Sequence, residues 1–244
     1  MHKIALTQTE KALAYLDTGA VYFAMRSCEY SKVQDQDQRR TRLLCVRNFR
    51  FFKDNIEIPH SDPNLQLANC VSITFESQKN DEKNETVTQE RSGDDTMCPV
   101  ISWATTIQRI RSYPTSTSNS PINIIKIQNR LYNITSKDNI NFLRRSVASM
   151  DTTKLGFKAN EIGTHSLRSG GAMAMKLSGA EDSTIRLIGR WKSDSFLKYI
   201  RKQVLQFSSN ISRRMLDQEH FTHIPNFDKN SSPSKLRMAP SPSK

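Results

Sequence analysis

The stretch between residues 164 and 201 sets the tightest limits on what this chain can fold into. It is interrupted at Gly179 and Gly189, which are natural stop positions for helices. Gly170 and Gly171 lack a Cβ, so another element could approach this part of the chain closely. We therefore predict three short helices here, over 165–177, 182–188 and 193–205. A chain that ends in such helices is expected to be mostly α-helical.

Longer helices are predicted in the first two thirds of the chain. Their ranges are 7–25, 100–112 and 136–150. Pro99 suits the first helical position of the second helix, and Ser136 suits the cap of the third. Gly19 is expected to loosen the middle of the first helix, because glycine is a weak helix former.

Strand patterns are confined to a few short segments. Residues 71–75 alternate apolar and polar side chains, and residues 86–88 could return as their partner strand. This hairpin would carry Lys79 near its tip. Segments 43–52 and 122–134 are also predicted to be extended. The predicted fold class is therefore α+β, mostly α-helical with a small antiparallel β-sheet.

The chain is strongly basic. It has 36 Lys and Arg against 24 Asp and Glu, which gives a net charge of +12. This balance favours a polyanionic partner, because binding phosphates releases counterions, although a basic surface without such a partner has the same composition. No apolar run approaches the ~20 residues that a membrane helix needs, and the start lacks a secretory signal. We expect an intracellular protein without a membrane partner.

The cysteines and histidines do not predict a metal centre. The chain has four cysteines, at positions 28, 45, 70 and 98, and none forms a CxxC pair. We expect reduced, mostly buried thiols rather than a disulfide framework. His220 and His223 lie three residues apart but have no cysteine near them, whereas structural zinc takes four ligands.

Four residues near the C-terminus have side chains suited to chemistry on a phosphodiester. His165 and Arg168 are three apart, so on a helix they would share one face. Trp191 and Tyr199 follow one helix later. Taken singly, each has a simpler interpretation as a structural or solvated residue. Their order, His-x-x-Arg, then Trp, then Tyr, is the informative feature.

This order resembles the tyrosine recombinase, or phage-integrase, family of DNA breaking and rejoining enzymes. The sequence Gly189-Arg190-Trp191 is most similar to recombinases of eukaryotic mobile elements of the crypton and DIRS kinds. Upstream, Arg26 with Glu29 three residues later resembles the first arginine of the family. Lys79 fits the family's lysine on a β-hairpin, with Lys83 as a rival four residues on.

The resemblance implies a role for each of these residues. Two arginines, Arg26 and Arg168, would neutralise the negative charge that builds on the phosphate oxygens. Lys79 would protonate the departing 5′ oxygen, and His165 would accept the proton of the nucleophile Tyr199. The remaining two residues would support the site, Trp191 by packing and Glu29 by orienting a basic neighbour. The chemistry requires neither a metal nor another cofactor.

The resemblance also implies an organisation and partners. Residues 1–207 would form the catalytic domain, and residues 208–244 a polar, disordered tail. We find nothing like the N-terminal helical domain with which family members close around DNA. The expected substrate is double-stranded DNA, the assembly a homo-tetramer, and the reaction the integration or excision of mobile DNA. The location would be the nucleus in a eukaryote and otherwise the cytoplasm.

Two features leave alternatives open. Trp191 and Tyr199 are eight residues apart, where many members have nine, so the phenol could be shifted relative to the phosphate. A non-catalytic DNA-binding module derived from such an enzyme would keep the basic surface without turnover. A type IB topoisomerase-like activity would use the same tyrosine chemistry to relax supercoils.

Overall fold

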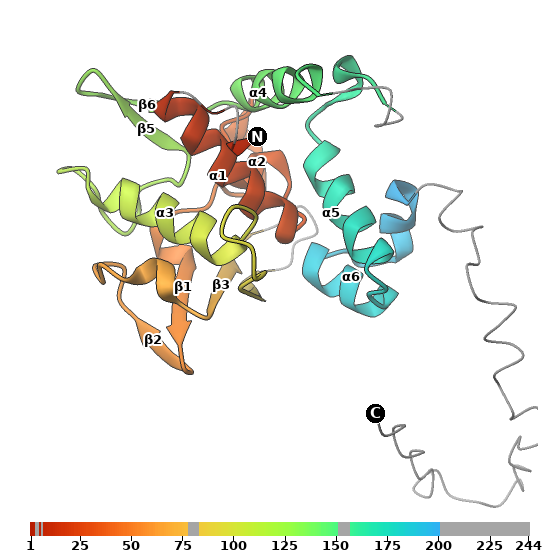
Figure 1. The fold of residues 1–244 in the computed structure, drawn as a ribbon, viewed down its shortest axis with the longest axis horizontal. Helices are drawn as coiled ribbons and strands as arrows, with labels where there is room; N and C mark the ends of the chain where they lie inside the picture. Colours follow the sequence, from red (N-terminus) through yellow and green to blue (C-terminus); the bar gives the residue numbers. More distant parts are fainter. Residues whose placement is uncertain (3–4, 6, 78–82, 151–156, 201–244) are drawn as a thin grey trace, which may run out of the picture. The chain divides into compact units, whose positions relative to one another are not determined.

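Helices and short strands alternate along the chain, as Figure 1 shows. A computed structural model describes residues 1–2, 5, 7–77, 83–150 and 157–200. Its α-helices are α1 (Gln8–Tyr22), α2 (Ser27–Tyr30), α3 (Pro99–Arg111), α4 (Ser136–Ala148), α5 (Ser166–Leu177) and α6 (Asp182–Gly189). Its strands are β1 (Phe49–Lys53), β2 (Ile56–Ile58), β3 (Cys70–Phe75), β4 (Glu85–Glu90), β5 (Ile124–Ile127) and β6 (Arg130–Asn133). The predicted α+β class is confirmed.

Helix α1 is the element around which the other helices pack. It begins at a capping box, in which Thr7 accepts from the backbone of Glu10 and the Glu10 carboxylate accepts from the backbone of Thr7. It packs against α3, α4 and α5 (Figure 1). The prediction that Gly19 loosens this helix is wrong. A Cβ at Gly19 would lie 2.4 Å from Trp103, so the glycine makes room for that ring.

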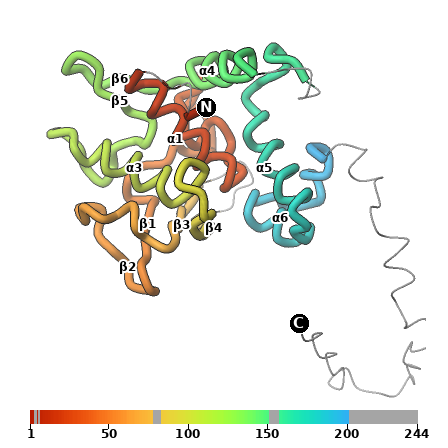
Figure 2. The backbone as a smooth tube through the Cα atoms, in the orientation of Figure 1, coloured from red at the N-terminus to blue at the C-terminus, as the bar shows by residue number. Residues whose placement is uncertain are grey.

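The larger sheet is antiparallel, with strand order β2-β1-β3-β4. The predicted hairpin is confirmed, because β3 and β4 pair from Cys70–Glu90 to Phe75–Glu85. The tube in Figure 2 shows α3 beside this sheet, and α3 contacts both β3 and β4. The predicted strand over 43–52 is wrong in its first half. Val46–Asn48 forms a 3₁₀ turn, in which the side chain of Asn48 accepts from the backbone of Cys45 at 2.7 Å.

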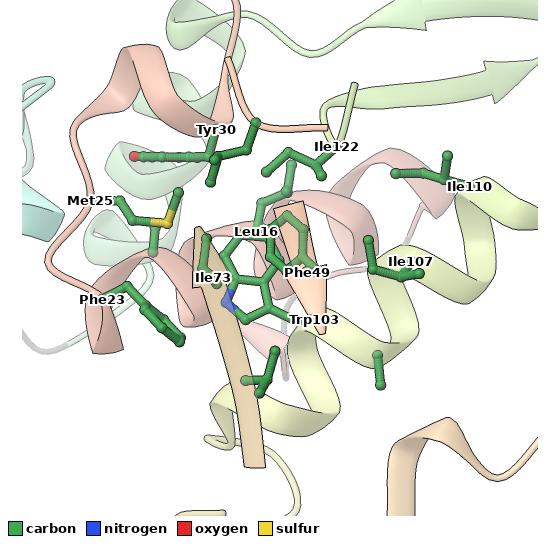
Figure 3. Packing of buried hydrophobic residues seen from close by; sticks show 14 of the residues in the cluster. Leu16, Phe23, Met25, Tyr30, Phe49, Ile73, Trp103, Ile107, Ile110 and Ile122 are labelled. Atoms are coloured by element: carbon green, nitrogen blue, oxygen red, sulfur yellow. The ribbon is translucent and has the colours of Figure 1, made fainter. Parts of the chain in front are cut away.

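The hydrophobic core lies between α1, α3 and the sheet. Trp103 of α3 is fully buried, and its ring centroid lies 4.8 Å from that of Phe49 in β1. Figure 3 shows Leu16 of α1 and Ile73 of β3 beside them. Full burial of such side chains contributes roughly 2 kcal/mol each. This core therefore fixes the end of α1, from which the first candidate site residues follow.

Two further segments have the predicted type of secondary structure. The segment predicted to be extended, 122–134, contains the antiparallel pair β5–β6, which turns at Gln128 and Asn129 with positive φ angles. Helix α4 starts as predicted at Ser136, but its cap is Thr135 rather than Ser136. Thr135 is the N-cap because its side chain accepts a hydrogen bond from the backbone of Asp138, which completes a capping box.

The C-terminal helices carry most of the residues that the sequence analysis singled out. Helices α5 and α6 match the first two short helices predicted there. The described part of the third, predicted over 193–205, is a 3₁₀ helix, η7 (Asp194–Tyr199), and residues 201–205 lie outside the described ranges. His165 is the N-cap of α5 and not a helical residue, so the argument that it shares a helix face with Arg168 is wrong. The predicted tail, 208–244, lies outside the described residues.

Candidate functional site

Residues that are far apart in the sequence line one cavity of about 1080 Å³. Among those that line it are Arg26, His165, Arg168, Trp191 and Tyr199. The spacing of eight residues between Trp191 and Tyr199 thus still leaves both on the cavity wall. Lys79 lies outside the described residues, whereas Lys83 is exposed and does not line the cavity.

All the charged side chains that the described residues contribute to the cavity lining are basic. Its cationic residues are Arg26, Arg39, Arg40, Arg168, Lys192 and Lys198. Within the described part of the chain, no Asp or Glu lines it. Hydroxyl groups, among them those of Ser27, Thr41 and Ser193, add neutral hydrogen-bond donors. A concave surface of this composition concentrates anions, because low-dielectric walls focus the field of the cations.

Arg26 is held by a carboxylate three residues further along. It is the N-cap of α2, and its backbone N–H donates to Glu29 Oε2 at 2.8 Å. Its Nη1 donates to Glu29 Oε1 at 3.1 Å. The side chain of Glu29 is only 1% exposed, whereas that of Arg26 is 15% exposed. The carboxylate therefore lies behind the arginine and orients it from the protein side.

Glu29 stays ionised because cations surround it. Burial raises its pKa, but the guanidiniums of Arg190, Arg26 and Arg168 lower it by more. The resulting pKa lies below the ordinary value for a glutamate. A negative charge at Glu29 is thus stabilised by its neighbours, and it can hold Arg26 at neutral pH.

Arg168 is anchored by the ends of two helices. Its Nη2 donates to the carbonyl of Gly189 at 2.6 Å, and its Nη1 donates to the carbonyl of Ala24. Gly189 is the last residue of α6, and Ala24 follows the C-cap of α1. Carbonyls at a helix C-terminus lack intrahelical partners and carry partial negative charge, so a guanidinium stabilises them. These bonds fix the orientation of Arg168 before any ligand binds.

Keeping Arg168 charged in its buried position costs free energy. The residue is only 2% exposed. Burial, followed by the nearby charge of Arg26, lowers its pKa from 12.5 to about 9. Ionisation of Tyr199 would raise that pKa, so the phenol lies within electrostatic reach of the guanidinium. An anion bound in the cavity would offset the same cost.

Trp191 covers Arg168 and is itself in contact with two further aromatic rings, whose planes are tilted relative to its own. The guanidinium carbon of Arg168 lies 4.1 Å from the centroid of Trp191, a cation–π contact. The Trp191 ring lies 6.0 Å from that of Tyr199 and 5.7 Å from that of Phe196. A Cβ at Gly189 would lie 1.7 Å from the Trp191 ring. Glycine at this position therefore allows the indole to fold back and support both Arg168 and Tyr199.

The base of the β3–β4 hairpin touches the cavity wall. The hydroxyl of Ser77 donates to the carbonyl of Arg40 at 2.6 Å, and the backbone N–H of Arg42 donates to the carbonyl of Ser77. Ser77 is the last described residue before the gap at 78–82, which includes Lys79. The segment that contains the candidate lysine thus starts beside a cavity residue.

Sequence reasoning missed several cations at the site. Arg39 and Arg40 were visible only as a basic pair, and Lys192 and Lys198 only as neighbours of Trp191 and Tyr199. A further arginine, Arg190, lies behind the cavity, where it pairs with Glu29. Its position between Gly189 and Trp191 was a signal, but its partners Glu29 and Phe23 are more than 160 residues away in the chain.

In the described ranges, no group of three or more His, Cys, Asp or Glu could hold a metal ion. The candidate pair His220 and His223 lies outside those ranges. All four cysteines are free, with Cys28 and Cys98 buried and the others half-buried. Over the part of the chain that is described, no helix is both long and apolar enough to cross a membrane.

Comparisons of the chain with protein-family models, with curated proteins and with solved structures found no match.

Proposed function

We propose that this protein cleaves and rejoins double-stranded DNA through a covalent bond between Tyr199 and a 3′ phosphate, as tyrosine recombinases do. The observation that carries the proposal is the convergence of Arg26, His165, Arg168 and Tyr199 on one cavity whose described lining has no acidic residue. Over 170 residues separate the first from the last. Their order in the sequence does not by itself require them to meet.

The charge balance around the cavity favours a phosphate ligand. Three guanidiniums, those of Arg26, Arg168 and Arg190, act on the carboxylate of Glu29. Glu85 also acts on Arg190, so two negative charges oppose three positive ones and these groups keep a positive excess. Excess charge of one sign in a buried cluster is costly, and the lowered pKa of Arg168 reflects burial together with that repulsion. A phosphodiester, and still more its doubly charged transition state, offsets the excess.

In the proposed reaction, the Tyr199 oxygen attacks phosphorus while the bond from phosphorus to the 5′ oxygen breaks. His165 accepts the phenolic proton, and the hairpin lysine, Lys79 in our interpretation, donates a proton to the 5′ oxygen. Arg26 and Arg168 stabilise the added charge on the non-bridging oxygens, an effect worth about 3–4 kcal/mol in comparable oxyanion sites. The bond energy is conserved, so attack by a 5′ hydroxyl reverses the step. The proposed role is integration or excision of mobile DNA.

The test uses a pool of nicked duplexes of random sequence, because the DNA target is not known from the residues. Nicking close to the cleavage point releases the short 5′-hydroxyl fragment and traps the protein on DNA. We expect wild type to form an adduct that survives denaturation, and Tyr199→Phe to form none. Tyr22→Phe is a matched control, because Tyr22 is a partly buried tyrosine that does not line the cavity.

The same experiment separates the alternatives. DNA binding without an adduct, equal in wild type and Tyr199→Phe, would leave only a binding module. Relaxation of a supercoiled plasmid by wild type, without exchange between two duplexes, would favour the topoisomerase-like activity. An adduct of equal yield in wild type and Tyr199→Phe would contradict the proposed nucleophile.

A further inference from the structure

Arg190 is a buried charged residue to which the proposed chemistry gives no role. It is the C-cap of α6 and adopts a left-handed conformation, with φ of 57°. Its side chain is 1% exposed, and its guanidinium carbon lies 3.5 Å from the ring centroid of Phe75, at the end of β3. Placing a non-glycine residue in this conformation and burying its charge both cost free energy. The surrounding contacts must offset that cost.

The contacts of Arg190 join the two parts of the chain that form the cavity. Its Nη1 donates to the carbonyl of Phe23 at 3.1 Å and to that of Ile188 at 3.2 Å. Phe23 is the C-cap of α1, and α1 has no basic residue in its own last turn. Arg190 therefore supplies a cation to the C-terminus of a helix over 160 residues away. Arg168 bonds to the neighbouring carbonyl, that of Ala24.

The remaining contact of Arg190 is with the carboxylate that orients Arg26. Its Nη2 donates to Glu29 Oε2 at 2.8 Å. The same oxygen accepts from the backbone of Arg26, while Glu29 Oε1 accepts from Arg26 Nη1. Because Arg190 binds Oε2, Glu29 does not offer both oxygens to the Arg26 guanidinium in a bidentate pair. The Glu29 carboxylate is thus shared between the guanidiniums of Arg26 and Arg190, and it orients Arg26 through one oxygen.

We propose that Arg190 is a positioning residue which, by sharing the Glu29 carboxylate, keeps the guanidinium of Arg26 turned to the cavity and available to the scissile phosphate. This inference rests on the proposed function. Arg190 acts through Glu29 and does not line the cavity itself. Without Arg190, Glu29 Oε2 loses one of its donors, and a closer pairing of Glu29 with Arg26 would draw that guanidinium away from the phosphate.

The charges around Arg168 provide a second readout. The groups that act on it are Arg26, Glu29, Arg190 and Tyr199. Burial lowers the pKa of Arg168 most, and the positive charges of Arg26 and Arg190 lower it further. Removing Arg190 therefore raises the pKa of Arg168. A residue with only a packing role would not move that pKa by charge.

The test measures the rate of adduct formation at saturating DNA, using a duplex recovered from the random pool. Arg190→Met keeps a long apolar side chain but removes the charged guanidinium and its hydrogen-bond donors. We expect this variant to slow the rate on the order of 10- to 100-fold, the scale on which a misplaced group acts. The fall in its rate at alkaline pH should begin at a higher pH than in wild type, because the pKa of Arg168 is raised. Arg186→Met is the matched control, because Arg186 is on the same helix, is partly exposed and does not line the cavity.

A second pair of variants keeps the inference testable if Arg190→Met fails to fold. Glu29→Gln leaves no carboxylate at position 29 for Arg190 to share, and the double variant Glu29→Gln/Arg190→Met also removes the buried charge of Arg190 itself. If Arg190 acts through Glu29, the double variant is no slower than Glu29→Gln.

The inference is overturned by a folded Arg190→Met with the wild-type rate and an unshifted alkaline limb. It is also overturned if the double variant is slower than Glu29→Gln by the same factor that Arg190→Met shows alone. In both cases wild type still forms its adduct, so the proposed function survives. Absence of any adduct in wild type removes the proposed function, and this inference with it.

Discussion

At the scale of single residues, the guanidinium of Arg168 is held ready for an anion. Helix-end carbonyls fix its direction, the Trp191 ring covers one face, and burial lowers its pKa to about 9. The folded pKa lies below the ordinary value, so this group loses its proton in the folded state at a lower pH than in the unfolded chain. Its unfavourable effect on stability is therefore present at neutral pH and is relieved as the pH rises above about 9.

Anion binding should follow the opposite trend. Above about pH 9 Arg168 loses its charge, so DNA should bind more weakly. We expect a loss of about tenfold at pH 10, because one pH unit above the folded pKa leaves roughly a tenth of the molecules charged at Arg168. The measurement is the dissociation constant of a nicked duplex between pH 7 and 10 at constant ionic strength, in the Tyr199→Phe background. Arg168→Met in that background should bind weakly at pH 7 and lack the loss near pH 9. The same pH dependence in both proteins would contradict the role of Arg168.

At the scale of elements, the packing of α5 on α1 brings the two halves of the site together. A Cβ at Gly171 would lie 2.3 Å from the carbonyl oxygen of Val21, so the helix approaches the backbone at the end of α1. A Cβ at Gly170, one residue earlier, would meet nothing within 4 Å. The close approach of α1 thus requires a glycine at position 171 but leaves room for a side chain at position 170.

Alanine substitutions at these glycines should have opposite effects on stability. Gly171→Ala forces the helices apart, and we expect it to lower the free energy of unfolding by about 1–3 kcal/mol. Gly170→Ala should raise it by roughly 0.5–1 kcal/mol, because alanine is the better helix former. Denaturant unfolding of both variants checks this. Equal effects of the same sign would mean that α5 does not pack on α1 as described.

Elements whose signals are local could be predicted from the sequence, and those fixed by distant contacts could not. Pro99 marks the start of α3, and the alternation over 71–75 marks β3. By contrast, residues 43–45 are as apolar as a strand, but only an isolated bridge between Cys45 and Pro121 forms there, because Val46–Asn48 turns into a 3₁₀ helix.

The same limit applies to the candidate site. The order of the His, Arg, Trp and Tyr residues is visible in the sequence, and the structure brings Arg26, His165, Arg168, Trp191 and Tyr199 to one cavity. Arg190 could not be recognised in this way, because its importance depends on Glu29, Phe23 and Phe75. Nothing in the residues near position 190 shows which of the cations there will be buried.

At the scale of the whole molecule, the chain is basic and several of its cations line the cavity. The net charge is +12, and six of the cationic residues line that one surface. A ligand that spans the cavity would meet Arg39 and Arg40 on one segment and Lys192 and Lys198 on another. Such a spread of charge suits a polyanion with phosphates on both sides of the bond that reacts.

The salt dependence of DNA binding tests this distribution of charge. If Arg39 and Arg40 each neutralise one phosphate, Arg39→Gln/Arg40→Gln should reduce the slope of log K against log salt by about 1.8 units. The control is Arg111→Gln/Arg130→Gln, which removes two exposed arginines that do not line the cavity. It should leave the slope closer to wild type. Equal slopes for the two double variants would show that the charge acts without regard to position.

The central claim is that the phenol of Tyr199 attacks the DNA backbone. The most direct measurement is mass spectrometry of the protein trapped on nicked duplex, after nuclease and protease digestion. The account predicts one modified peptide, with a nucleotide joined through its 3′ phosphate to Tyr199. A nucleotide on another residue, a 5′ linkage, or no modified peptide under conditions where the duplex binds would contradict it.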